Sequence, residues 1–122
     1  MPVRSLNSSV LKWPDRSAVD QAARAWAQVE AERHPELQRL GYFGSYARGD
    51  WSVGSDLDLV AIVDRSFEPL ERRALGWDLL DLPIPAELLI YTADEWKSLK
   101  RKGGRFVRVL EREVVWIYGR AD

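Results

Sequence analysis

Two kinds of hydrophobic spacing follow one another along this chain. The run from residue 57 to residue 63 is apolar at every position except Asp58, which is typical of a central strand covered on both faces. Between such runs, apolar residues recur three or four positions apart, which indicates helices with one buried face. The predicted strands are 37–43, 57–63, 84–92 and 114–118, and the predicted helices are 17–34, 45–48, 70–81, 94–100 and 106–112. The pattern predicts a sheet with helices packed on it.

Local signals mark the ends of the first long helix. Ser17 is a suitable N-cap with Asp20 at the capping-box position, and Pro35 ends the helix. The apolar face is predicted to consist of Val19, Ala22, Ala23, Trp26 and Val29. Because residues 1–16 show no clear period and include two prolines, we expect an N-terminal arm over 1–16 and one folded domain over 17–120.

The composition limits what the chain can be. With 122 residues it can bury one core but not two, and its 46% hydrophobic and 30% charged residues are typical of a soluble globular protein. No apolar run approaches the roughly 20 residues that a membrane span requires, and the N-terminus lacks a signal-peptide core. The absence of cysteine excludes disulfides, a thiol nucleophile and Cys-ligated metals, so any metal must be held by oxygens. We therefore expect a cytoplasmic protein.

The charge is nearly balanced overall but uneven locally. A net charge of −1 gives no reason to expect direct binding of nucleic acid. Residues 97–108 nevertheless carry six basic side chains and no acidic one. These are Lys97, Lys100, Arg101, Lys102, Arg105 and Arg108. Two interpretations stay open: a solvated loop with its flanking helix ends, or an electropositive rim that faces a triphosphate or an acidic partner surface.

The candidate chemistry lies between residues 44 and 59, in Gly-Ser-Tyr-Ala-Arg-Gly followed by Ser-Asp-Leu-Asp-Leu. In an extended chain the side chains of Asp56 and Asp58 point the same way, roughly 6.5 to 7 Å apart, so the pair can share a cation. Gly44 lets the backbone pass close to an anion, Ser45 offers a hydroxyl, and a helix that starts here directs free N–H groups at phosphate. A Walker P-loop is excluded, because no Gly-Lys-Ser/Thr follows the turn. Metal and phosphate are predicted to meet here, which suggests nucleotidyl transfer.

These residues resemble the signature of the DNA polymerase β-like nucleotidyltransferases, and the short chain is similar to their minimal nucleotidyltransferase (MNT) branch over residues 37–118. The resemblance implies an α+β fold, in which a mixed sheet is flanked by helices in a single domain. It also implies that Asp56 and Asp58 bind Mg²⁺ bridged to the triphosphate of ATP. Gly44 and Ser45 would then hold the outer phosphates.

The family has a third acid on the strand after the intervening helix, and the matching residue here is Glu87. The family more often has Asp at this position. By resemblance, Glu87 completes the metal site and could help to deprotonate an acceptor hydroxyl, although its extra methylene makes the geometry looser. The alternative is an exposed carboxylate paired with an arginine.

Several neighbouring residues have two open interpretations. Arg48 could reach phosphate or pair with Asp50, and Ser55 could donate to Asp56 or cap the loop. Trp51 could stack on a base, contact a partner or fold back onto the sheet. His34 precedes a proline at a helix end, and we expect a structural role for it.

The resemblance further implies a function. MNT proteins are typically paired with a HEPN-domain protein, often as the antitoxin of a toxin–antitoxin system, and can transfer AMP from ATP to a tyrosine of that partner. A hetero-oligomer is therefore expected. Two other functions stay open: a binding module that neutralises its partner by occlusion, and a small-molecule nucleotidyltransferase of the aminoglycoside-modifying type.

Overall fold

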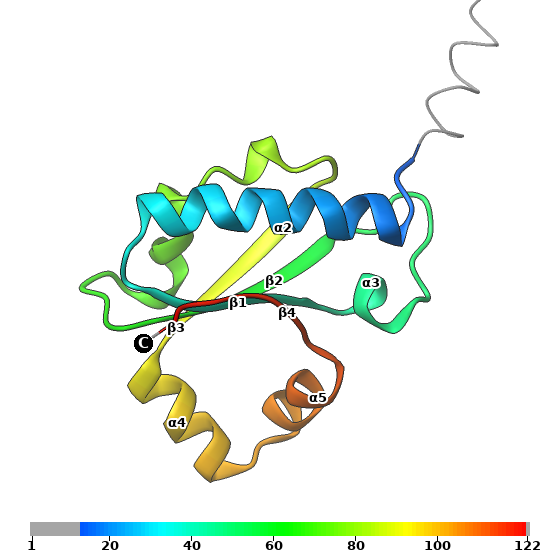
Figure 1. Ribbon diagram of the computed structural model, residues 1–122. Coiled ribbons are helices and arrows are strands. Elements are labelled where there is room, and N and C mark those ends of the chain that lie inside the picture. Colours follow the sequence, from blue (N-terminus) through cyan, green and yellow to red (C-terminus); the bar gives the residue numbers. More distant parts are fainter. Residues whose placement is uncertain (1–12, 122) are drawn as a thin grey trace, which may run out of the picture.

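The computed structural model describes residues 13–121, and in this part of the chain a four-stranded mixed sheet lies between two layers of helices (Figure 1). The strands are β1 Leu37–Phe43, β2 Leu57–Val63, β3 Ala86–Thr92 and β4 Val115–Gly119. The α-helices are α2 Arg16–Arg33, α3 Ser45–Arg48, α4 Ala93–Lys102 and α5 Arg105–Glu113, and two 3-10 helices are η1 Leu70–Gly76 and η2 Leu79–Asp81. This arrangement confirms the predicted α+β class.

The sheet has the strand order β3-β2-β1-β4, with β2 and β3 parallel and the other pairs antiparallel. Alternate residues of β2 enter two hydrophobic cores, one on each face of the sheet, so the expectation that the chain could bury only one core is wrong. Leu57, Leu59, Ala61 and Val63 belong to the core under α2, and Val60 and Ile62 belong to the core under α4 and α5. A strand covered on both faces is apolar almost throughout, as its sequence predicted.

The N-cap of helix α2 lies two residues earlier than expected. Asp15, not Ser17, is the N-cap, and its carboxylate accepts a hydrogen bond from the Ala18 amide at 2.9 Å. Asp20 is not part of a capping box, because its carboxylate binds the Arg24 guanidinium and the hydroxyl of Tyr42, each at 2.7 Å. The start of the predicted arm, residues 1–12, lies outside the described residues.

The buried face of α2 is also shifted from the predicted one. Val29 is 47% exposed, whereas Ala27 and Glu30 are buried. The buried Glu30 carboxylate accepts from the Asp78 amide at 3.0 Å and from Arg33 at 3.3 Å. A buried carboxylate needs such partners, and here they join α2 to the segment between β2 and β3.

The segment between β2 and β3, residues 64–85, is called the crossover below. The predicted α-helix over 70–81 is wrong, because η1 and η2 are short 3-10 helices. Trp77 interrupts them with extended backbone (φ −108°, ψ 144°), which takes its ring into the core under α2. Leu80, at the helical spacing from Trp77, is 96% exposed. Burial of the large indole therefore outweighs helix continuation.

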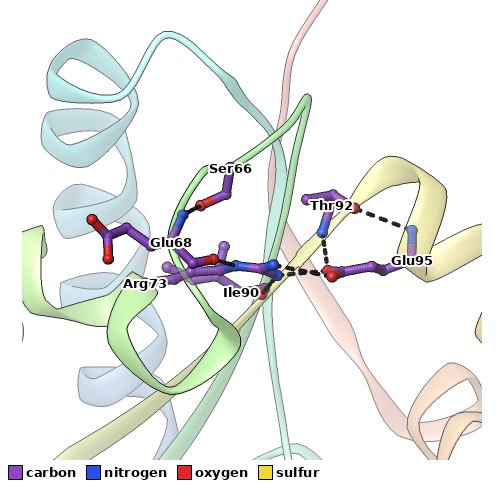
Figure 2. A network of polar contacts seen from close by, with 6 residues as sticks. All are labelled: Ser66, Glu68, Arg73, Ile90, Thr92 and Glu95. Atoms are coloured by element: carbon purple, nitrogen blue, oxygen red, sulfur yellow. Dashed lines mark hydrogen bonds and ion pairs between the residues drawn. The ribbon is translucent and has the colours of Figure 1, made fainter.

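Arg73 fastens the crossover to the sheet edge (Figure 2). Its Nε donates to the Glu68 carbonyl at 2.8 Å and its Nη1 to the Ile90 carbonyl at 3.0 Å. The same guanidinium binds both carboxylate oxygens of Glu95, with Nη2 and Oε2 3.0 Å apart. Glu95 forms a capping box with Thr92 at the start of α4. Arg73, as a hydrogen-bond donor, holds the pKa of Glu95 at about 2, well below its ordinary 4.5.

We predict that Arg73→Met lowers the free energy of unfolding by about 1 to 3 kcal/mol, because it leaves the Ile90 carbonyl and Glu95 without their shared donor. The side chain of Arg73 is 8% exposed. The neighbouring Arg72 is 62% exposed and pairs with Glu68 at 3.5 Å, so Arg72→Met is the matched control and should change stability little. Chemical unfolding of both variants measures this, and equal losses would contradict it.

Candidate active site

The strand register fixes Asp58 between two neighbours. It lies opposite Phe43 of β1 and beside Glu87 of β3. Because β2 and β3 are parallel, both carboxylates stand at the same end of the sheet. Asp56 comes just before β2 begins, and its side chain and that of Glu87 are exposed, whereas Asp58 is half-buried. The predicted acids are therefore neighbours, with Asp58 the innermost.

Gly44 closes the site beside Asp58. Its φ of +81° favours glycine, and an added Cβ would collide with Oδ2 of Asp58 and lie 3.3 Å from its Cγ. Helix α3 follows at once, and its first residue, Ser45, has no side-chain hydrogen bond within residues 13–121. The turn therefore brings the Gly44 backbone next to the Asp58 carboxylate.

Arg48, in the last turn of α3, has two acidic partners. Its Nε lies 3.1 Å from Asp50, and its Nη1 lies 3.3 Å from Glu113. These hydrogen bonds, the one to Asp50 first, raise the pKa of Arg48 above its ordinary value. Of the two open interpretations of Arg48, the pairing with Asp50 is present, and Glu113 is an additional partner.

The loop between α3 and β2 is held by its own polar groups. The Ser55 hydroxyl accepts from the Ser52 amide at 2.9 Å, so it caps the loop rather than donating to Asp56. Trp51 stacks on Tyr46, with ring centroids 5.4 Å apart, and packs against the core under α2. Of the interpretations for Trp51, folding back onto the protein matches the structure. His34 likewise has the expected structural role, because it caps α2.

Glu113 is a site residue that sequence reasoning missed. It ends α5, its side chain is 15% exposed, and its Oε1 accepts from the Gly44 amide at 2.9 Å. No spacing rule links position 113 to position 44, because their contact depends on where α5 ends relative to β1. In the sequence, nothing distinguishes Glu113 from the neighbouring Glu111.

Like charges crowd around Asp58. Burial raises its pKa above the ordinary 3.8, and the carboxylates of Glu87, Asp56 and Glu113 raise it further, while Arg48 opposes them. As they stand, no three His, Asp or Glu side chains of residues 13–121 converge closely enough to ligate one metal ion. The carboxylates form an electrostatic cluster with only oxygen donors.

The basic stretch lies on α4 and α5. A surface hollow of about 650 Å³ is lined by Asp94, Lys97, Lys100 and Arg101, and none of the candidate site residues lines it. Lys100 pairs with Glu111 at 3.5 Å. The hollow is therefore a feature separate from the carboxylates.

The nucleotidyltransferase domain family matches residues 27–116, which include every candidate site residue. The chain belongs to this family. In this nucleotidyltransferase, the carboxylates and the glycine turn lie at one end of the sheet. The turn follows β1, and the carboxylates lie near the starts of β2 and β3. No protein of curated function matches the sequence significantly.

Solved structures are similar to this nucleotidyltransferase in fold. A protein from Sulfolobus solfataricus assigned as a nucleotidyltransferase aligns with a TM-score of 0.62 at 19% identity, over 86% of this chain and 84% of that one. A toxin–antitoxin structure with AMP-PNP aligns with a TM-score of 0.49 at 16% identity, over 80% and 73%. In residues 13–121 of this nucleotidyltransferase, no helix is long and apolar enough to cross a membrane.

We predict that Asp58→Asn raises the melting temperature at pH 7 in metal-free buffer. The folded-state pKa of Asp58 lies above its ordinary value of 3.8. At neutral pH the wild type therefore carries a charge that burial and repulsion disfavour. Below pH 3.8 this carboxyl is protonated, and the destabilisation is lost. The gain should therefore shrink as the pH falls toward 4. Asp56→Asn, which removes the same charge from an exposed side chain, is the control and should gain less. A melting temperature lowered by Asp58→Asn at pH 7 would show that the carboxylate is structural.

Proposed function

We propose that this nucleotidyltransferase is a Mg²⁺-dependent enzyme that transfers AMP from ATP to a hydroxyl of a partner protein. The partner is proposed to be a HEPN-domain protein with a tyrosine acceptor, and the chain to be the antitoxin of the pair. The observation that carries the transfer chemistry is the placement of Asp58 between Gly44 and Glu87. The resemblance to MNT proteins supports the partner and the antitoxin role.

The chemistry of the candidate donors suits Mg²⁺, and a bound cation would have to draw their side chains together. The candidate ligands Asp56, Asp58 and Glu87 offer only carboxylate oxygens, which are the ligands that Mg²⁺ prefers. Crowded like charges around Asp58 favour a cation at this place. When bound, Mg²⁺ supplies charge neutralisation of the triphosphate and of the leaving pyrophosphate.

The protein's own groups would orient the reactants. The Gly44 turn, the Ser45 hydroxyl and Arg48 would hold the outer phosphates by hydrogen bonds and charge. Glu87 is exposed beside Asp58 and can accept a proton from an approaching hydroxyl. Positioning for in-line attack then supplies much of the rate.

The surroundings of Glu87 suit a macromolecular acceptor. The chain just before it lines an apolar hollow of about 390 Å³, which ends at Ala86. On the crossover, Phe67 and Leu80 are 97% and 96% exposed, and Leu75 is 72% exposed. Large apolar side chains held in solvent are typical of protein interaction surfaces. A partner seated over the hollow that ends at Ala86 would bring its hydroxyl near Glu87.

We predict that Mg-ATP raises the melting temperature more than ATP in excess chelator does. Without a divalent cation, the carboxylates around Asp58 repel the triphosphate. Differential scanning fluorimetry at matched ionic strength measures both shifts. Equal stabilisation in the two conditions would contradict the metal-bridged arrangement.

We predict that Glu87→Gln reduces AMP transfer by a factor of about 10² or more while ATP affinity changes little, since the amide keeps the shape but loses the charge. The measurement is the intact mass of the co-purified partner from the native host, with and without Mg-ATP. Glu71→Gln, an exposed acid on η1, is the matched control.

Transfer by Glu87→Gln at the wild-type rate would contradict the role of Glu87. If neither form modifies the partner but both still silence it, the protein neutralises by occlusion. Modification of an aminoglycoside instead of the partner would indicate a small-molecule nucleotidyltransferase.

A further inference from the structure

We propose that Glu113 is an internal anion that occupies the phosphate-binding donors in the free protein and is displaced when a triphosphate binds. It would thus be a positioning residue that sets nucleotide affinity. This inference rests on the proposed function, because it concerns the same turn.

The contacts of Glu113 are those expected of a bound anion. Its Oε1 accepts from the Gly44 amide at 2.9 Å, and Arg48 Nη1 lies 3.5 Å from Oε1 and 3.3 Å from Oε2. Gly44 and Arg48 are two of the groups that would hold the outer phosphates. One carboxylate therefore engages a backbone donor and a cation that a phosphate needs.

Glu113 is also fixed in place by the fold. It is the last residue of α5, and the Val114 amide that follows donates to the Leu110 carbonyl at 2.8 Å. Leu110 is buried in the core under α4 and α5, and β4 begins at Val115 and pairs with β1. Because both sides of Glu113 are anchored, its carboxylate returns to the turn whenever the turn is empty.

Carboxylate and phosphate cannot use the same donors together. Hydrogen bonds between a backbone N–H and an ionised acceptor are roughly twice as strong as neutral ones, so Glu113 is a real competitor for Gly44. Its charge also repels an incoming phosphate within a partly buried site. Removing the charge while keeping the shape should therefore strengthen phosphate binding.

The test is calorimetric titration of the purified full chain with inorganic tripolyphosphate in excess chelator, which isolates the phosphate groups from metal and base. We expect Glu113→Gln to bind it about tenfold or more tightly than the wild type, as expected for loss of a competing charge. Glu111→Gln is the matched control, because it removes the same charge two residues earlier, where the carboxylate pairs with Lys100. It should bind like the wild type.

Affinity of Glu113→Gln equal to or weaker than that of the wild type would overturn the proposal, since a residue that only supports the turn would weaken binding when changed. Equal gains in Glu113→Gln and Glu111→Gln would overturn it too, because the effect would then be one of net charge. Thermal melting checks that the variants are folded, and Glu113→Ala replaces the glutamine variant if that variant does not fold.

The Arg48→Gln background gives a second readout. If Glu113 competes by holding Arg48, Glu113→Gln should gain less in that background than in the wild type. If Glu113→Gln raises the affinity for tripolyphosphate equally in both backgrounds, Glu113 competes only for the Gly44 amide. That result would overturn the part of the proposal that involves Arg48.

Repeating the titration with Mg-ATP separates the two proposals. Tighter tripolyphosphate binding by Glu113→Gln, with no Mg-ATP binding by any variant, would support the role of Glu113 and contradict the proposed function. If the wild type binds Mg-ATP and Glu113→Gln binds neither ligand more tightly than the wild type does, the result would support the proposed function and contradict the role of Glu113.

Discussion

A carboxylate at the end of a strand buried on both faces is the constraint on which this site depends. Every residue of β2 except Asp58 is fully enclosed, so the strand is rigid and its polar end has little freedom. Burial disfavours the charge on Asp58, and the pairing of β2 with β3 brings Glu87 beside it. A cation or hydrogen-bond donor that binds here would therefore relieve an unfavourable electrostatic interaction. The hydrophobic pattern that forms the sheet therefore also produces the crowded negative charge that favours a cation at this site.

The sequence correctly predicted the elements whose structure is determined by local pattern. β1, α3 and β2 have the predicted bounds, because a doubly buried strand and a glycine turn leave few alternatives. The crossover was mispredicted because helical spacing cannot reveal that Trp77 packs in the core while Leu80 stays in solvent. The N-cap of α2 was misplaced by two residues, since Asp15 and Ser17 are both good caps.

The candidate site likewise contains residues that the sequence predicted and residues that it did not. Asp56 and Asp58 could be paired from their spacing, and Glu87 was implied by the family resemblance; the parallel pairing of β2 and β3 brings Glu87 beside Asp58. Glu113 could not, because its place depends on the packing of α5 against the sheet, which only the whole fold determines. Contacts between distant segments leave no periodic trace in the sequence. The same holds for Arg73 and Glu30, charged side chains that help to tie the crossover to its neighbours.

The position of β4 has a consequence for the order in which this site is built. Among the strands of residues 13–121, β4 pairs with β1 alone, and it packs so closely there that a Cβ at Gly41 would lie 2.7 Å from the Val115 carbonyl oxygen. During synthesis, β1, β2 and β3 leave the ribosome first and can pair, which gathers the carboxylates. Helix α5 and β4 follow, so the Gly44 turn gains its contact with Glu113 last. A nascent chain therefore exposes a turn with open donors before it has the anion that occupies them.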